Sequence, residues 1–167
     1  SKNYKFSDIN SYKCMKLIKK FNPEVGVVFG TGKISPKLIK IFKGKLINIH
    51  RGIMTKYRGL DSEFWASYHR DFRSIGTTVH FINKFLDKGK TIFEKKLILK
   101  FGMKAYMLRY FTTILAAKNI NNILKKIKNK KVKSNDKQNH GRYYSFIPLE
   151  IKKIAYQNFN KHCLSLK

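Results

Sequence analysis

The chain has 167 residues (19.7 kDa), enough for one domain with a buried core, and its 43% apolar and 14% aromatic residues exclude a wholly disordered protein. No apolar run approaches the roughly 20 residues of a membrane-crossing helix, so we predict a cytoplasmic protein without a membrane partner. The formal net charge of +28 favours an anionic partner. Because the lysines are scattered along the chain, we favour compositional bias over nucleic-acid binding, which stays open, and the charge would also attract a small anionic substrate.

The first part of the chain alternates between short helices and buried strands. Apolar residues at helical spacing over Ile9–Phe21 predict a helix capped by Asp8. Val25–Phe29 is continuously apolar, which is typical of a strand buried on both faces of a parallel sheet. A glycine loop and a short helix capped by Ser35 follow, and Leu46–His50 is the next buried strand. This order predicts an α/β fold with a Rossmann-like, mostly parallel sheet and flanking helices.

The rest of the chain is predicted to become helical after two more strands. The expected elements are a helix at Leu60–Arg70, strands at Gly76–Asn83 and Thr91–Leu99, a long amphipathic helix from Phe101 to about Asn129, a charged linker near residues 128–141, a short strand at Arg142–Pro148, and a closing helix at Leu149–Leu166. We therefore divide the chain into a partial Rossmann-like core at residues 1–100 and a helical C-terminal extension at 101–167.

Three polar residues stand at or beside predicted strand ends, where open α/β sheets bind their ligands. Asn48 and His50 lie two residues apart and so on one face of their strand, and Asp87 follows a later strand. An amide, an imidazole and a carboxylate together can polarise a carbonyl, stabilise its oxyanion and move a proton. The simpler alternative for each residue is a structural hydrogen bond.

Other chemistries find little support. The sequence has no Ser or Cys nucleophile in a strand-to-helix elbow, which argues against covalent acyl catalysis. Cys14 and Cys163 are far apart without metal-ligand spacing, so we interpret them as reduced structural thiols and expect no metal.

One segment resembles the core of the folate-dependent formyltransferases. It reads "INIHRGIMTKYRGLDSEFW", continues to "GTTVHFINKFLDKGKTI", and matches the family's Asn-x-His pair, glycine-bearing loop, Gly-x-Thr-x-His strand and Leu-Asp-x-Gly motif in order and spacing. The resemblance covers about Val25 to Leu99. It implies direct transfer of a formyl group from N10-formyltetrahydrofolate to a primary amine, without a covalent enzyme intermediate.

The resemblance also implies roles for individual residues. Asn48 and His50 match the pair that binds and polarises the formyl oxygen, and Asp87 matches the carboxylate that holds a water and relays the proton. His80 and Thr78 would support these groups from behind, with core packing an equal alternative for His80. The family's two pterin-binding loops map to Gly30, Thr31, Gly32, Lys33 and Ile34 and to Lys84, Phe85 and Leu86.

The acceptor is less well marked than the chemistry. Gly52 and Thr55 stand where the family often has Ser and Pro, and this variant resembles members that formylate nucleotide-linked amino sugars for surface polysaccharides. We therefore expect such a substrate, with Tyr57, Arg58, Tyr143 and Tyr144 as candidate contacts, although core packing is the better explanation for the two later tyrosines. Formylation of glycinamide ribonucleotide or methionyl-tRNA stays open, as does an inactive fragment.

The resemblance also predicts an incomplete sheet. The family's domain normally begins with further strand–helix units before the strand that matches Val25–Phe29, and only a short segment precedes it here. This strand would become an edge with unpaired backbone groups. We expect a missing N-terminal segment or a second copy in a homodimer to cover that edge.

Overall fold

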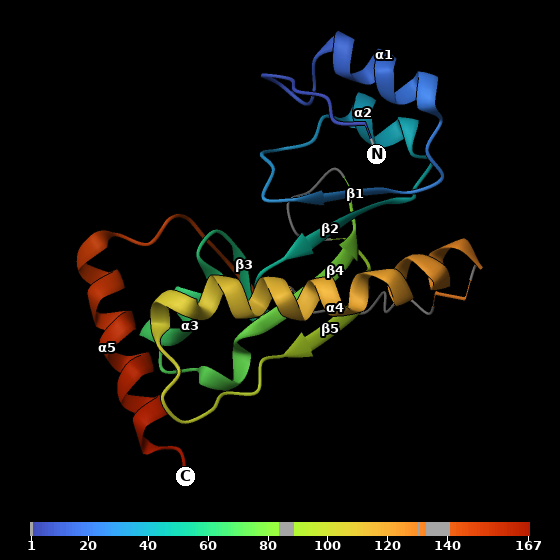
Figure 1. Ribbon diagram of the computed structural model, residues 1–167. Coiled ribbons are helices and arrows are strands. Elements are labelled where there is room, and N and C mark those ends of the chain that lie inside the picture. Colours follow the sequence, from blue (N-terminus) through green and yellow to red (C-terminus); the bar gives the residue numbers. More distant parts are fainter. Residues whose placement is uncertain (1, 84–88, 130, 133–140) are drawn as a thin grey trace.

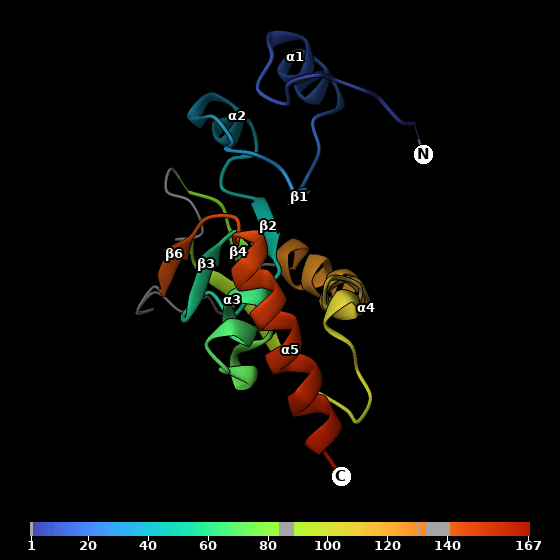
Figure 2. The same cartoon turned by 90° about the vertical axis from the view of Figure 1, so that its left-hand side faces the viewer.

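The computed structural model describes residues 2–83, 89–129, 131–132 and 141–167, and it shows an α/β fold with a mixed sheet and flanking helices (Figures 1 and 2). The main sheet has four strands in the spatial order β1, β2, β4, β5. Their bounds are Gly26–Phe29, Leu46–His50, Gly76–Phe81 and Thr91–Lys96. The last of these is shorter than the predicted strand to Leu99.

The prediction of a mostly parallel sheet is wrong. In the main sheet, as far as the structure describes it, β1 and β2 are parallel, whereas β4 runs antiparallel to both of its neighbours. The reason lies in the loop that follows β2. The Thr78 hydroxyl of β4 donates to the Gly52 carbonyl at 2.7 Å and accepts from the Met54 N–H at 3.2 Å. The chain therefore re-enters the sheet at the end where β2 leaves it, and no crossover carries it back.

β1 lies at an edge of the sheet, as the resemblance predicted. Within the described residues it pairs with β2 alone, and its side chains alternate between buried and exposed. Val28 is buried, while Val27 and Phe29 are 42% and 40% exposed. The expectation that this strand is buried on both faces is therefore wrong, because the side chains on one of its faces stay partly exposed.

Two short helices cover β1 and the start of the sheet. They are α1 (Tyr12–Phe21) and α2 (Pro36–Ile41), which pack against each other (Figure 1). Ser35 caps α2 as predicted, with its hydroxyl accepting from the Leu38 N–H at 3.3 Å. Asp8 does not cap α1; Ser11 does, at 3.3 Å from the Cys14 nitrogen, and Asp8 instead accepts from the Asn10 N–H.

The long helix α4 spans Leu108–Lys128 and packs along β4. It starts later than predicted, after a 3-10 turn at Ala105–Met107. Ile123 and Ile127 of α4 join Ile47 and Val79 of the sheet in one buried cluster, and the Thr77 hydroxyl donates to the Thr112 carbonyl at 2.7 Å. None of the described helices is long and apolar enough to cross a membrane.

The C-terminal segments share a hydrophobic core with the middle of the chain. Helix α5 (Leu149–Ser165) lies against α3 (Ser62–Tyr68), with Phe64 and Phe159 in the same buried cluster (Figure 2). A second sheet pairs β3 (Tyr57–Gly59) in parallel with β6 (Arg142–Tyr144). The pattern predicted β6 but not β3, which has only three residues and no alternation of its own. A 3-10 turn at Phe72–Ser74 connects α3 to β4.

Candidate functional site

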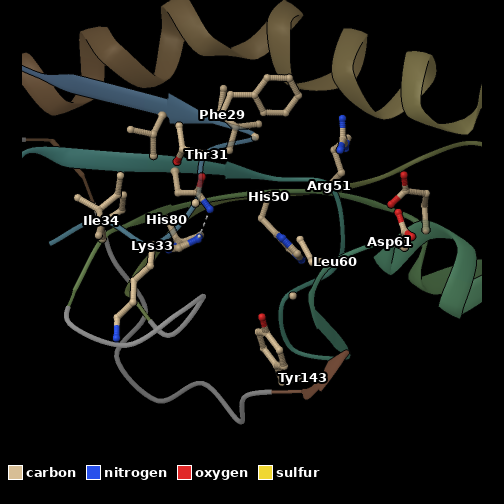
Figure 3. A pocket seen from close by; sticks show the side chains of 18 of the residues that line it. Phe29, Thr31, Lys33, Ile34, His50, Arg51, Leu60, Asp61, His80 and Tyr143 are labelled. Carbon is tan, nitrogen blue, oxygen red and sulfur yellow. Dashed lines mark hydrogen bonds between the residues drawn. The ribbon is translucent and has the colours of Figure 1, made fainter. Parts of the chain in front are cut away.

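A cavity of about 530 Å³ opens where β1 and β2 end (Figure 3). It collects most of the described residues that the sequence singled out. Those that line it are Gly30, Thr31, Gly32, Lys33, Ile34, Asn48, His50, His80 and Tyr143. Asp87, Lys84, Phe85 and Leu86 lie outside the described residues, so their assigned roles stay predictions.

Asn48 and His80 contact each other across the sheet. The register of β2 and β4 places them opposite one another, and the Asn48 amide nitrogen lies 3.2 Å from His80 Nε2. His80 Nδ1 is 2.9 Å from the Phe81 carbonyl, which can only accept a hydrogen bond. Nδ1 therefore carries the proton, and Nε2 accepts from the Asn48 amide. These two hydrogen bonds fix the orientation of the Asn48 side chain at the cavity wall.

His50 is held by the loop that follows it. Its side chain is buried, and Nε2 lies 3.0 Å from the Tyr57 carbonyl and 3.3 Å from the Ser62 hydroxyl. Because a carbonyl only accepts, Nε2 carries a proton in this arrangement. Ser62 was missed by the sequence reasoning, although it brings a hydroxyl to the imidazole in a chain that has Gly52 where the family often has Ser.

The close approach of Ser62 to His50 requires a glycine at position 52. A Cβ atom on Gly52 would lie 2.6 Å from His50 Nε2 and 2.7 Å from Ser62 Cβ. The departure from the family pattern at this position therefore has a packing reason. Thr78 does not line the cavity, but its hydroxyl holds the Gly52 carbonyl from behind.

The glycine loop after β1 is open to the cavity. Gly30 has a φ of +63°, and a Cβ atom added to either Gly30 or Gly32 would have no neighbour within 4 Å. The end of the loop is braced by Asn10, whose amide donates to the Lys33 carbonyl at 3.0 Å and accepts from the Ser35 N–H at 2.7 Å. Sequence reasoning missed Asn10, since nothing in the local pattern relates it to a loop more than twenty residues away.

A cluster of four charged side chains forms another part of the cavity wall, and it was also missed. Asp61 and Glu63 at the start of α3 meet Arg109 of α4, and Arg51 follows β2. Asp61 accepts hydrogen bonds from the Arg109 guanidinium and, at 3.2 Å, from the Ile147 N–H. Burial raises the pKa of Glu63, whereas the charges of Arg51 and Arg109 and a bond from its own backbone act in the opposite direction.

Of the four residues predicted to contact the substrate, the structure places one at the cavity and three away from it. Tyr143 lines the cavity, but Tyr57, Arg58 and Tyr144 do not. Tyr57 is buried and stacks on Tyr144 at 5.5 Å between ring centroids, and burial raises its pKa. Arg58 donates to the Gly141 carbonyl at 2.6 Å. Their proposed contacts with a substrate stay predictions, whereas the described geometry gives Tyr57, Arg58 and Tyr144 partners within the protein.

The chain belongs to the formyl transferase family, whose sequence model matches residues 1–104. Two curated relatives illustrate the match. A methionyl-tRNA formyltransferase of Caldanaerobacter subterraneus subsp. tengcongensis is 27% identical over 89% of this chain and 48% of its own length. A phosphoribosylglycinamide formyltransferase of Escherichia coli is 36% identical over 47% of this chain and 37% of its own length. The chain thus spans less than half the length of either relative.

Solved structures of low sequence identity share the fold. The formyltransferase PseJ from Anoxybacillus kamchatkensis matches with a TM-score of 0.67 and 21% identity over 79% of this chain and 68% of that chain. That protein was determined in complex with UDP-4,6-dideoxy-4-formamido-L-AltNAc and tetrahydrofolate. A sugar N-formyltransferase from Shewanella has a TM-score of 0.71 and 16% identity over 91% of this chain and 65% of that chain.

We predict that Gly52→Ala destabilises the protein by about 1–3 kcal/mol, because the added methyl group must displace His50 or Ser62 from a packed position. Gly32→Ala is the matched control, since its Cβ would meet nothing within 4 Å, and it should change stability by less than about 1 kcal/mol. Urea unfolding followed by circular dichroism measures both. Equal stabilities for the two variants would contradict the tight contact at position 52.

We also predict a pH-dependent gain in stability for Glu63→Gln. Burial holds the pKa of Glu63 above its ordinary value of 4.5, so the folded protein binds this proton more tightly than the unfolded chain does. The free energy of unfolding of the wild type should therefore fall as the pH rises from about 4.5 through the folded-state pKa. The glutamine does not ionise. The free energy of unfolding of the variant minus that of the wild type should therefore increase with pH over this range and then level off.

The measurement is urea unfolding between pH 4 and pH 8. Glu150→Gln, which removes one carboxylate from the exposed first turn of α5, controls for the change in net charge. A difference between Glu63→Gln and wild type that decreases with pH would show that the arginines outweigh burial at this site.

Proposed function

We propose that the protein is an N-formyltransferase that moves a formyl group from N10-formyltetrahydrofolate to the amine of a nucleotide-linked amino sugar. One observation carries the proposal. Asn48 is hydrogen-bonded to His80 on the wall of a cavity that His50 and the glycine loop also line. An amide and an imidazole at strand ends, beside an open glycine loop, are the groups that a formyl transfer between two bound molecules requires.

In this proposal the glycine loop receives the folate. Its backbone is open to the cavity, and Asn10 holds its far end in place, so the loop offers N–H and C=O groups to a flat heterocycle. The folate would supply the formyl group already activated at a nitrogen. In such a contact the side chains of Gly30–Ile34 would matter less than their backbone.

Asn48 and His50 would act on the formyl oxygen. When the amine attacks, negative charge develops on that oxygen, and N–H donors held in place by the protein stabilise it without reorganisation. The Asn48 side chain is fixed by His80, and its second amide N–H would donate to the oxyanion. The His50 ring is fixed through Nε2 by the Tyr57 carbonyl and Ser62, so the formyl oxygen would meet its Nδ1, which would donate when it also carries a proton. Asp87 would take part in the proton transfer, a role that rests on the family resemblance.

The amino sugar is the favoured acceptor because of the cavity's size and lining. About 530 Å³ accommodates a sugar nucleotide in part, and Tyr143 lines the wall, where its ring can contact an acceptor. The PseJ complex, which has the same fold, holds a UDP-linked formamido sugar. A nucleotide's phosphates would also be attracted by the net charge of +28.

Methionyl-tRNA and glycinamide ribonucleotide are the alternative acceptors, since the curated relatives described above carry those activities in their names. The tRNA alternative also suits the positive charge. It predicts formyl-methionyl-tRNA as a product and an affinity that falls steeply as salt rises, because phosphate contacts release counterions. We expect a formylated amino sugar instead, with no formyl-methionyl-tRNA formed. If formyl-methionyl-tRNA formed and no amino sugar were formylated, methionyl-tRNA would replace the amino sugar as the proposed acceptor.

We predict that Asn48→Ala lowers the rate of formyl transfer by about 100- to 1,000-fold, the usual effect of removing one oxyanion donor. The assay follows the N-formyl product by mass spectrometry, with N10-formyltetrahydrofolate and a panel of nucleotide-linked amino sugars. Asn122→Ala, on the exposed face of α4, is the matched control and should keep the wild-type rate. An Asn48→Ala variant as active as the control would refute the role of the amide, and no transfer to any amino sugar by the wild type would refute the proposed acceptor.

A further inference from the structure

Glu63 carries a buried carboxylate oxygen that has no hydrogen-bond partner among the residues that the structure describes. The side chain is 2% exposed, yet Glu63 lines the cavity. Its Oε1 atom lies 3.4 Å from Arg109 Nε, close enough for charge attraction but without hydrogen-bond geometry. A buried acceptor without a donor is costly, so this oxygen is suited to a donor that arrives with a ligand.

The neighbours of Glu63 are already committed to other contacts. The Arg109 guanidinium bonds to Asp61 and lies over the Phe64 ring at 5.4 Å. The other oxygen of Asp61 accepts from the Ile147 N–H. Arg51 lies over the Phe29 ring at 5.3 Å, and its charge acts on Glu63 from a distance. The unpartnered oxygen of Glu63 is therefore the acceptor that this cluster leaves for a bound molecule.

The charges of the cluster indicate what kind of group binds there. Two guanidinium groups and two carboxylates cancel formally. A phosphate would face both carboxylates, and an ammonium group would face both guanidinium groups, so neither ion gains from this wall. A neutral O–H group donates to Glu63 and meets neither repulsion. The unpartnered acceptor, its burial and the balanced charges of the cluster together favour a neutral donor, and hydroxyls are the most numerous neutral donors on a sugar.

The position of the cluster relates it to the proposed reaction. Figure 3 shows Lys33 and Ile34 on one side of the cavity, Arg51 and Asp61 on the other, and His50 between them. A donor bound on the glycine loop would leave the opposite side to the acceptor. An acceptor whose amine reaches His50 would therefore place another part of its ring system beside Arg51 and Asp61.

We propose that Glu63 Oε1 accepts a hydrogen bond from a hydroxyl group of the acceptor sugar and thereby makes the site selective for a hydroxylated acceptor over its deoxy counterpart. This inference rests on the proposed function and adds a specificity-determining residue to it. The rejection of the deoxy sugar follows because its C–H group would leave the buried oxygen without a donor and without water. Hydrogen bonds to charged groups make a difference of roughly 10- to 100-fold in affinity.

The test is isothermal titration of the protein, in the presence of tetrahydrofolate, with UDP-linked amino sugars whose ring hydroxyls are replaced by hydrogen one at a time. For the wild type, one replacement should weaken binding by roughly 10- to 100-fold. The same replacement should cost less in Glu63→Gln, which keeps an uncharged acceptor oxygen, and nothing measurable in Glu63→Leu, which keeps none. Glu150→Gln should behave as the wild type.

Each result decides the proposal. Equal affinities of the wild type for all members of the series would overturn it, and so would a deoxy penalty that persists unchanged in Glu63→Gln and Glu63→Leu. If Glu63→Leu does not fold, the comparison of Glu63→Gln with Glu150→Gln still decides. Formyl transfer to amino sugars without any discrimination by hydroxyl would overturn the role of Glu63 alone, whereas the absence of both binding and transfer would overturn the proposed function with it.

Discussion

The candidate site depends above all on the register between β2 and β4. Asn48 lies opposite His80, and the next pair on the same face is His50 opposite Thr78. A shift of one residue would turn each strand's side chains to the other face of the sheet and separate the amide from the imidazole. The register is secured from both sides. Ile47 and Val79, both fully buried, pack under α4, and Thr78 holds the loop after β2 through two hydrogen bonds.

The same register explains why the irregular loop after β2 has so little freedom. The imidazole of His50 bonds to the Tyr57 carbonyl and contacts Ser62, so a single ring connects the strand end to β3 and to the start of α3. Gly52 has to pass between them without a side chain. The polar contacts of His50 that we assign to function therefore also determine the path of the loop. A substitution at His50, Gly52 or Ser62 is expected to change the local fold and the site together.

Sequence reasoning found the residues whose local pattern carries information. The Asn48–His50 spacing, the apolar strands and the Ser35-Pro36 start of α2 could all be inferred from a few neighbouring residues, and the structure places Asn48, His50 and His80 on one cavity. The direction of β4 could not be inferred in this way, because it depends on where a 25-residue connection ends. β3 and the Asn10 brace were missed for the same reason, since each depends on a partner far away in the chain. Glu63 was missed because a lone glutamate near the start of a helix normally faces solvent, whereas here it is buried beside Arg109 of α4, a residue far away in the chain.

The cavity wall combines residues from within the family match with a few from beyond it, and this bears on the question of the acceptor. The glycine loop, Asn48, His50 and His80 all lie within residues 1–104, the part that matches the formyl transferase family. Arg109, Tyr143 and Phe146 line the same cavity but lie beyond that match. Arg109 bonds to Asp61, and Asp61 in turn bonds to the backbone just before α5, so the later part of the chain fixes the carboxylates on the acceptor side. In the proposed function, the donor side would therefore lie wholly within the family match, whereas the acceptor side would combine Arg51, Asp61 and Glu63 from within it with Arg109 and Tyr143 from beyond it.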